Sequence, residues 1–160
     1  MTLKVGDKLP SVKLKTMTPE GPKDVSTDDL FAGKKAILFA LPGAFTPGCS
    51  MKHVPGYVQN FNALTAKGVD LIACLSVNDA FVMGAWGKDQ KADGKVMMLA
   101  DGNADFTKAA GMTLDAAGFG MGLRSQRYAA IVENGVVKHL CVEPSTGVDV
   151  SSAESVLKLL

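Results

Sequence analysis

Cysteine, aromatic residues and net charge are all scarce in this chain of 160 residues. Its three cysteines, Cys49, Cys74 and Cys141, are too few and too scattered for a disulfide framework, so we expect reduced thiols. A formal net charge of +1 gives no support for binding to nucleic acid or to an anionic membrane. No apolar run approaches membrane-spanning length, and the first residues lack the apolar stretch of a secretory signal. We therefore expect a cytoplasmic protein that binds neither nucleic acid nor membrane.

Two further absences concern redox and metal chemistry. No Cys-x-x-Cys pair occurs, which argues against a thioredoxin-type disulfide exchanger. Cys49 and His53 lie four residues apart, but two ligands do not make a zinc site and no Cys/His cluster follows. His53 could instead tune a nearby thiolate. The sequence therefore predicts neither a metal nor another cofactor.

The pattern of apolar residues predicts a single α/β domain spanning residues 1–160. Hydrophobic residues make up 47% of the chain, an ordinary value for a globular domain. Apolar or alternating runs predict strands at 11–16, 35–41, 69–77 and 95–101. Helical patterns follow the last three runs, at 50–68, 78–90 and 103–111. A hairpin at 127–143 with an Asn134-Gly135 turn and a helix at 151–160 complete the chain. This order predicts a central mixed, mostly parallel sheet flanked by helices, with β additions at both ends.

The chain turns abruptly after the run at 35–41, in the segment LPGAFTPGCS. Cys49 lies where the next helix should begin, and the free backbone N–H groups and helix dipole there favour a thiolate. The thiolate is the nucleophilic form of cysteine. Gly48 lets another group approach the backbone, and Thr46 can place a hydroxyl near the sulfur. The alternative is a helix-entry loop in which the cysteine only packs.

The segment Pro42 to Cys49, PGAFTPGC, resembles the Pro-x-x-x-Thr-x-x-Cys active-site motif of peroxiredoxins, and most closely the type II group that includes peroxiredoxin-5. Other segments resemble type II sequences in the same order: CSMKHVPGY, SVNDAFVMGAW, LADG, RSQRYA, VVKHLCVEP and VSSAESVLKLL. The resemblance covers nearly the whole chain. It implies a thioredoxin-like fold and a thiol peroxidase that reduces hydrogen peroxide and alkyl hydroperoxides without a cofactor.

The resemblance also implies a role for each residue of the motif. Cys49 would be the peroxidatic cysteine, which a peroxide oxidises to a sulfenic acid. Thr46, Arg127 and the backbone N–H of Cys49 would donate hydrogen bonds to the charge that develops on the departing oxygen. Pro42 would shield the sulfur from water. Arg124 is an alternative to Arg127 or a supporting contact.

The route that regenerates the cysteine stays open at this point. Segment 143–152 lacks the C-terminal resolving cysteine of some type II members. Cys74 lies 25 residues after Cys49, as the second cysteine of plant-type members does, but its apolar strand also fits a buried inert thiol. We expect direct reduction by glutathione or glutaredoxin, with thioredoxin acting through a Cys49–Cys74 disulfide as the second possibility. Cys141 is expected to pack in the hairpin.

Two further expectations concern assembly and the rival function. Type II members are commonly dimers with contacts near the active-site loops, so we expect a homodimer, and Phe119 is expected to line the mouth of the site. The competing interpretation is a non-catalytic thioredoxin-like module, a redox sensor or holdase that docks on partners.

Overall fold

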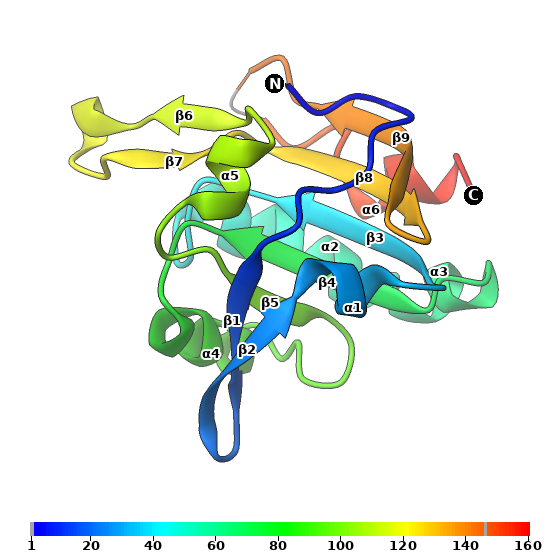
Figure 1. Cartoon of the computed structure of the whole chain (residues 1–160), viewed down its shortest axis with the longest axis horizontal. Helices are drawn as coiled ribbons and strands as arrows, with labels where there is room; N and C mark the ends of the chain where they lie inside the picture. The colour runs from blue at the N-terminus through cyan, green and yellow to red at the C-terminus, as the bar shows by residue number, and fades with distance from the viewer. Residues whose placement is uncertain (1, 146) are drawn as a thin grey trace.

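The computed structural model describes residues 2–145 and 147–160. Its centre is a seven-stranded sheet with the order β2-β1-β5-β4-β3-β8-β9 (Figure 1). These strands are β1 Lys13–Thr18, β2 Gly21–Ser26, β3 Lys35–Ala40, β4 Leu71–Ser76, β5 Met97–Ala100, β8 Tyr128–Glu133 and β9 Val136–Val142. The buried runs at 35–41, 69–77 and 95–101 thus form the three strands at the middle of the sheet.

The sheet is mixed, as predicted, and its parallel part is confined to the centre. Strand β4 pairs in parallel with β3 and with β5. The pairings of β1 with β2 and β5, of β3 with β8, and of β8 with β9 are antiparallel. The β additions at both ends of the chain are therefore confirmed, and they make the sheet less parallel than the alternation of strands and helices suggested.

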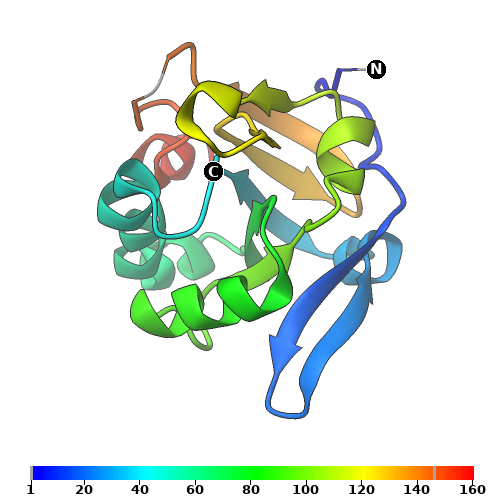
Figure 2. The same cartoon turned by 90° about the vertical axis from the view of Figure 1, so that its left-hand side faces the viewer.

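Helices cover both faces of the sheet (Figures 1 and 2). They are α1 Thr27–Phe31, η1 Cys49–His53, α2 Val54–Gln59, α3 Phe61–Ala66, α4 Ala80–Asp89, α5 Asp105–Ala109, η2 Ala117–Phe119 and α6 Ala153–Leu157. One core lies beneath α2, α3, α4 and α6 and contains Tyr57 and Trp86. The other lies beneath α1 and α5 and contains Phe31 and Phe106. No helix in the described part of the chain is long and apolar enough to cross a membrane.

The helix predicted at 50–68 is irregular, as expected from Pro55. Its first turns form the π-helix η1, and α2 and α3 are separated at Asn60, which has φ −95° and ψ 10°. Pro55 lies in the first turn of α2, where a missing N–H costs little. The π-helical turn therefore begins at Cys49. Such turns are frequent at functional sites.

Two hairpins decide what surrounds Cys49. The turn between β8 and β9 is of the predicted kind, since Asn134 and Gly135 have φ of 48° and 79°. The second hairpin is a small sheet of β6 Thr113–Asp115 and β7 Leu123–Ser125, joined by the glycine-rich residues 116–122. Figure 2 shows this second hairpin on the same side of the molecule as the loop that follows β3.

Candidate active site

Cys49 lies beyond the carboxyl end of β3, in the first turn of the helix that follows. Its side chain is fully buried in the core that α2, α4 and α6 cover. The chain reaches it through the loop 41–48, which the two prolines of the motif restrict. Ligands of α/β sheets bind at this edge, beyond the carboxyl ends of the parallel strands. The structure thus places the candidate nucleophile where the sequence predicted it.

Arg127 contacts the sulfur directly. Its Nη2 donates to Cys49 Sγ at 3.3 Å, although 78 residues separate the two in the chain. The register of β8 against β3 explains the contact, because Tyr128 pairs with Ala40 and Arg127 therefore lies beside the start of the loop 41–48. Arg127 is only 9% exposed, and a buried cation favours a thiolate as its neighbour.

Gly48 makes room for this guanidinium. A Cβ atom at Gly48 would lie 3.2 Å from Arg127 Nη2, which is tighter than ordinary packing. The sequence predicted that Gly48 lets another group approach the backbone, and the structure identifies that group as Arg127.

His53 holds the other side of the guanidinium. Arg127 Nη1 donates to His53 Nδ1 at 2.8 Å, and His53 Nε2 donates to the carbonyl oxygen of Ser151 at 3.1 Å. Burial lowers the pKa of His53 to about 3, and the positive charge of Arg127 acts in the same direction. The ring is therefore neutral near pH 7, with a lone pair on Nδ1 that can accept from Arg127.

The segment around Ser151 orients His53 in turn. The Ser151 carbonyl also accepts from the hydroxyl of Tyr57 at 2.8 Å. Glu143 accepts from both the backbone N–H and the hydroxyl of Ser151, at 2.8 and 2.6 Å. The sequence already allowed His53 to tune the thiolate, because His53 lies four residues from Cys49 on a predicted helix. The bond to Arg127 and the contribution of segment 143–151 were not foreseen.

Thr46 lies in the loop 41–48, called the catalytic loop below, and directly precedes the helical turn that begins at Pro47. Its hydroxyl donates to the carbonyl oxygen of Gly43 at 2.7 Å. Its backbone carbonyl accepts from Ser50 N at 2.9 Å, which closes the first helical turn around Cys49. Because this bond to Gly43 engages the hydroxyl proton, the Thr46 oxygen is left to accept a hydrogen bond from a substrate. The expectation that Thr46 donates to the departing oxygen is therefore corrected to an accepting role.

Arg124 supports the loop rather than the sulfur. Its Nε donates to the carbonyl of Met121 at 2.9 Å and its Nη1 to the carbonyl of Pro42 at 3.4 Å. A Cβ at Gly43 would lie 2.9 Å from Nη1, so Arg124 also lies against the loop backbone. Of the two arginines considered from sequence, Arg127 is the one that reaches Cys49.

The remaining residues predicted from the sequence do not take part in the contact between Arg127 and Cys49. Cys74 is fully buried in the middle of β4, and burial raises the pKa of its thiol, with a further increase from nearby Cys49. Cys141 lies on the edge strand β9 and is partly exposed. Phe119 is 85% exposed between β6 and β7, so its place at the mouth of the site stays a prediction. Among the described residues, no three His, Cys, Asp or Glu side chains converge on a possible metal position.

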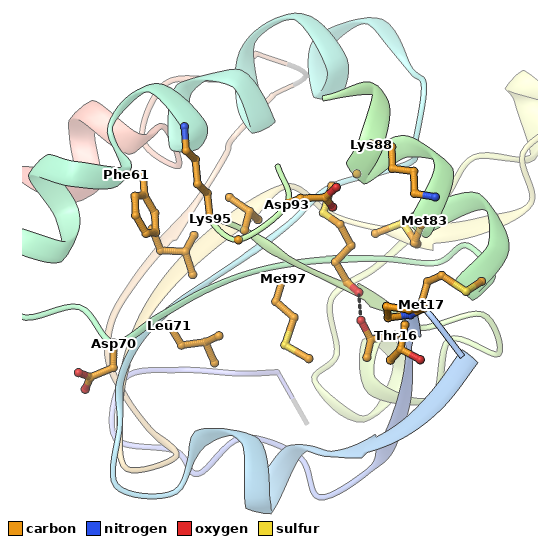
Figure 3. Close-up of a pocket in the computed structure, with 18 of the residues that line it drawn as sticks. Thr16, Met17, Phe61, Asp70, Leu71, Met83, Lys88, Asp93, Lys95 and Met97 are labelled. Carbon is orange, nitrogen blue, oxygen red and sulfur yellow. Dashed lines mark hydrogen bonds between the residues drawn. The ribbon is translucent and has the colours of Figure 1, made fainter. Parts of the chain in front are cut away.

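A cavity of about 770 Å³ lies elsewhere in the molecule. Figure 3 shows Met17, Met83 and Met97 among the side chains that line it, with Thr16 bonded to the carbonyl of Met98. Its wall includes Asp70 to Ile72 and Val96 to Met98, at the amino ends of β4 and β5. Cys49 lies beyond the opposite, carboxyl ends of the parallel strands, so this cavity belongs to a different part of the fold.

Comparison with known proteins agrees with this geometry. Residues 4–157 match the redoxin family. The protein named chloroplastic peroxiredoxin-2E of Arabidopsis thaliana is 51% identical over 163 residues, which cover 99% of this chain and 70% of the relative. The chain is a peroxiredoxin of the redoxin family. As a peroxiredoxin it is a thiol peroxidase, and peroxiredoxins use thiol reductants and no bound cofactor.

Solved structures match this peroxiredoxin over its whole length. The reduced Prx3 of Vibrio vulnificus in complex with hydrogen peroxide has a TM-score of 0.95 and 54% identity, covering 99% of both chains. A structure from Burkholderia cenocepacia described as a putative thioredoxin reductase has a TM-score of 0.98 and 50% identity, covering 100% of this chain and 99% of that one. These likenesses confirm the thioredoxin-like fold.

The comparisons do not assign the chain to one subfamily of peroxiredoxins. Peroxiredoxin 5 of Alvinella pompejana is 37% identical with a TM-score of 0.81, covering 91% of this chain and 92% of that one. Its likeness is lower than that of the Vibrio protein. Membership of the peroxiredoxin-5 subfamily therefore stays a prediction.

Proposed function

We propose that this peroxiredoxin reduces hydrogen peroxide and small alkyl hydroperoxides at Cys49, within one catalytic domain of residues 1–160. The observation that supports the proposal is the 3.3 Å hydrogen bond from Arg127 Nη2 to Cys49 Sγ in a buried site. A buried guanidinium stabilises the thiolate and can also donate to an oxygen that gains negative charge.

The proposed reaction is a displacement at oxygen. The thiolate of Cys49 attacks one peroxide oxygen, an S–O bond forms as the O–O bond breaks, and the second oxygen leaves with the electron pair. That oxygen takes up a proton and departs as water or an alcohol, while Cys49 becomes a sulfenic acid. Arg127 and the backbone N–H of Cys49 stabilise the departing charge, and the Thr46 oxygen accepts from the peroxide O–H. Pro42 limits the access of water.

A peroxide-consumption assay with glutathione and glutaredoxin tests this function. We expect steady turnover by the wild type and none by Cys49→Ser, because a hydroxyl at this position is not ionised near pH 7 and cannot replace the thiolate. Equal and negligible consumption by both proteins would contradict the proposal and favour the redox sensor or holdase. Insulin reduction, the activity of a disulfide exchanger, is not expected of either protein.

We further propose that an external thiol, glutathione or glutaredoxin, reduces the sulfenic acid directly. Cys74 is 0% exposed and burial raises its thiol pKa, so the chain must rearrange before Cys74 can attack as a thiolate. The proposal places the protein in a reducing compartment such as the cytoplasm. Thioredoxin acting through a Cys49–Cys74 disulfide is the second candidate.

Replacement of Cys74 separates the two routes. Cys74→Ser should keep at least about half of the turnover with glutaredoxin, because direct attack on Cys49 does not need a second cysteine. Cys141→Ser is the matched control on the partly exposed strand β9. Complete loss of turnover in Cys74→Ser alone, together with a Cys49–Cys74 bridge found by mass spectrometry of the wild type after stoichiometric peroxide, would exclude the direct route.

We also propose a homodimer that uses the face around the catalytic loop. Three phenylalanine side chains are exposed in the segments that this face would include: Phe45 at 54% in the loop, Phe81 at 68% at the start of α4 and Phe119 at 85% between β6 and β7. An exposed group of aromatic residues is typical of a protein interface. Light scattering should give the mass of a dimer for the wild type and of a monomer for Phe81→Glu. Val5→Glu, a change at an exposed valine beside β9, should remain dimeric; a monomeric wild type would refute the dimer.

A further inference from the structure

The middle of the catalytic loop is attached to the end of the central strand β4 by a hydrogen bond to the side chain of Asn78. Its Oδ1 accepts from the backbone N–H of Ala44 at 3.0 Å and from the hydroxyl of Ser76 at 2.7 Å. Ser76 is fully buried in the last position of β4, and its hydroxyl also lies 3.4 Å from the carbonyl of Leu41. Asn78 therefore connects a rigid strand end with the middle of the loop that carries the motif.

The loop needs such an external contact because its own turn is strained. Phe45 adopts φ 64°, a left-handed conformation that non-glycine residues rarely take, and its side chain is 54% exposed. Within the turn, Thr46 N donates to the Gly43 carbonyl only at 3.4 Å. The shorter bond is the one from the Thr46 hydroxyl to the same carbonyl, at 2.7 Å. The position of that hydroxyl therefore depends on where the Gly43–Ala44 peptide is held.

We propose that Asn78 is a positioning residue for the peroxidase reaction, which sets the Thr46 hydroxyl relative to Cys49 by holding the N–H of Ala44. The proposal rests on the proposed function. The effect passes through two hydrogen bonds. Asn78 holds the N–H of Ala44, and the Gly43 carbonyl of the same peptide unit orients the Thr46 hydroxyl. The Thr46 oxygen then accepts the hydrogen bond from the peroxide. Arg127, the residue before β8, reaches Cys49 from that strand's end and does not depend on this path.

Because Arg127 and Thr46 are held separately, the proposal predicts that Asn78→Ala changes the oxidation of Cys49 but not its alkylation. In Asn78→Ala the rate constant for oxidation of Cys49 by hydrogen peroxide should fall about tenfold to a hundredfold, because small displacements of positioning groups have effects of this size. The rate of Cys49 alkylation by iodoacetamide should stay within about twofold, since alkylation needs the thiolate beside Arg127 but not the Thr46 hydroxyl. A merely structural role would loosen the site and raise the alkylation rate as well.

The neighbouring residues supply matched controls. Asp79→Ala removes the cap of α4, in which Asp79 accepts from Val82 N at 2.8 Å, and should leave the oxidation rate of Cys49 within about twofold. Asn78→Asp keeps the accepting oxygen and should restore the rate to within about threefold of the wild type, because both bonds of Asn78 go to that oxygen. If Asn78→Ala does not fold, Ser76→Ala replaces it in the experiment. The rate of Cys49 oxidation in Ser76→Ala should then fall about threefold.

A double-mutant cycle with Thr46→Val decides whether Asn78 acts through Thr46. Adding Asn78→Ala to Thr46→Val should cause little further loss, because coupled residues are not additive. An oxidation rate in Asn78→Ala equal to that of the wild type, or a loss of the same size in both backgrounds, would overturn the inference. A wild type that fails to react with peroxide would instead refute the proposed function itself.

Discussion

Arg127→Met should reduce the rate of Cys49 oxidation by hydrogen peroxide about a hundredfold to a thousandfold, the usual effect of removing a donor aimed at developing charge. The guanidinium of Arg127 donates to Cys49 Sγ at 3.3 Å, and the residue is only 9% exposed. Without it the thiolate loses its buried counter-charge, and the departing oxygen loses a donor. Stopped-flow measurement of Cys49 oxidation at pH 7 gives the rate directly.

The same substitution should hardly change stability. None of the ion pairs between described residues includes Arg127, and a buried cation without an acidic partner costs stability. Its replacement by an apolar side chain of similar length offsets the lost hydrogen bonds. We therefore expect the free energy of unfolding in urea to change by less than about 2 kcal/mol. Activity and stability would thus separate at this position.

Arg124→Met is the matched control for the rate. Arg124 bonds the carbonyls of Met121 and Pro42 and not the sulfur, so its loss should slow oxidation less than about tenfold. Equal losses for both arginines would mean that general positive charge, and not the contact with Cys49, controls the reaction.

The second large effect is an acid sensitivity that comes from His53. Burial, with the charge of Arg127, lowers its pKa to about 3 in the folded protein, while the unfolded chain titrates near the model-peptide value of 6.5. The unfolded state therefore binds more protons between these two values, and stability rises with pH across that window. The stability that depends on neutral His53 is fully present above pH 6.5. It is lost as the pH falls below that value, and the free energy of unfolding then decreases by at most about 1.4 kcal/mol per pH unit.

His53→Gln tests this account. A glutamine can keep an acceptor for Arg127 and a donor for the Ser151 carbonyl, but it does not titrate. Urea unfolding between pH 7 and pH 5 should show a smaller loss of stability in His53→Gln than in the wild type. His139→Gln, at the exposed second histidine on β9, should follow the wild type.

The pH range of this experiment is chosen to exclude the nearby carboxylate. Burial raises the pKa of Glu143, but hydrogen bonds from Ser151, Asp149 and Val150 together lower it below its ordinary value of 4.5. Glu143 therefore contributes stability that is lost only at more acidic pH. Parallel curves for the wild type and His53→Gln between pH 7 and pH 5 would show that His53 is not the group responsible.

Local patterns in the sequence were sufficient for most elements of the fold. The buried runs predicted the three central strands, because a strand covered on both faces must be apolar throughout. Asn134-Gly135 predicted its hairpin, since both residues accept positive φ. Strand β2 and the small β6–β7 sheet were missed. They are largely exposed and polar or glycine-rich, so neither shows the alternation that identifies a strand.

The sequence by itself was enough to predict Cys49 as the nucleophile and to locate its loop, because the motif from Pro42 to Cys49 is contiguous and its backbone geometry is local. Only the tertiary structure decided which groups surround the sulfur. The choice of Arg127 over Arg124 follows from the register of β8 on β3, and the bond from His53 to Arg127 depends on a segment almost a hundred residues away. Such contacts are set by the packing of whole strands and helices, which places distant residues together without leaving a periodic trace along the chain.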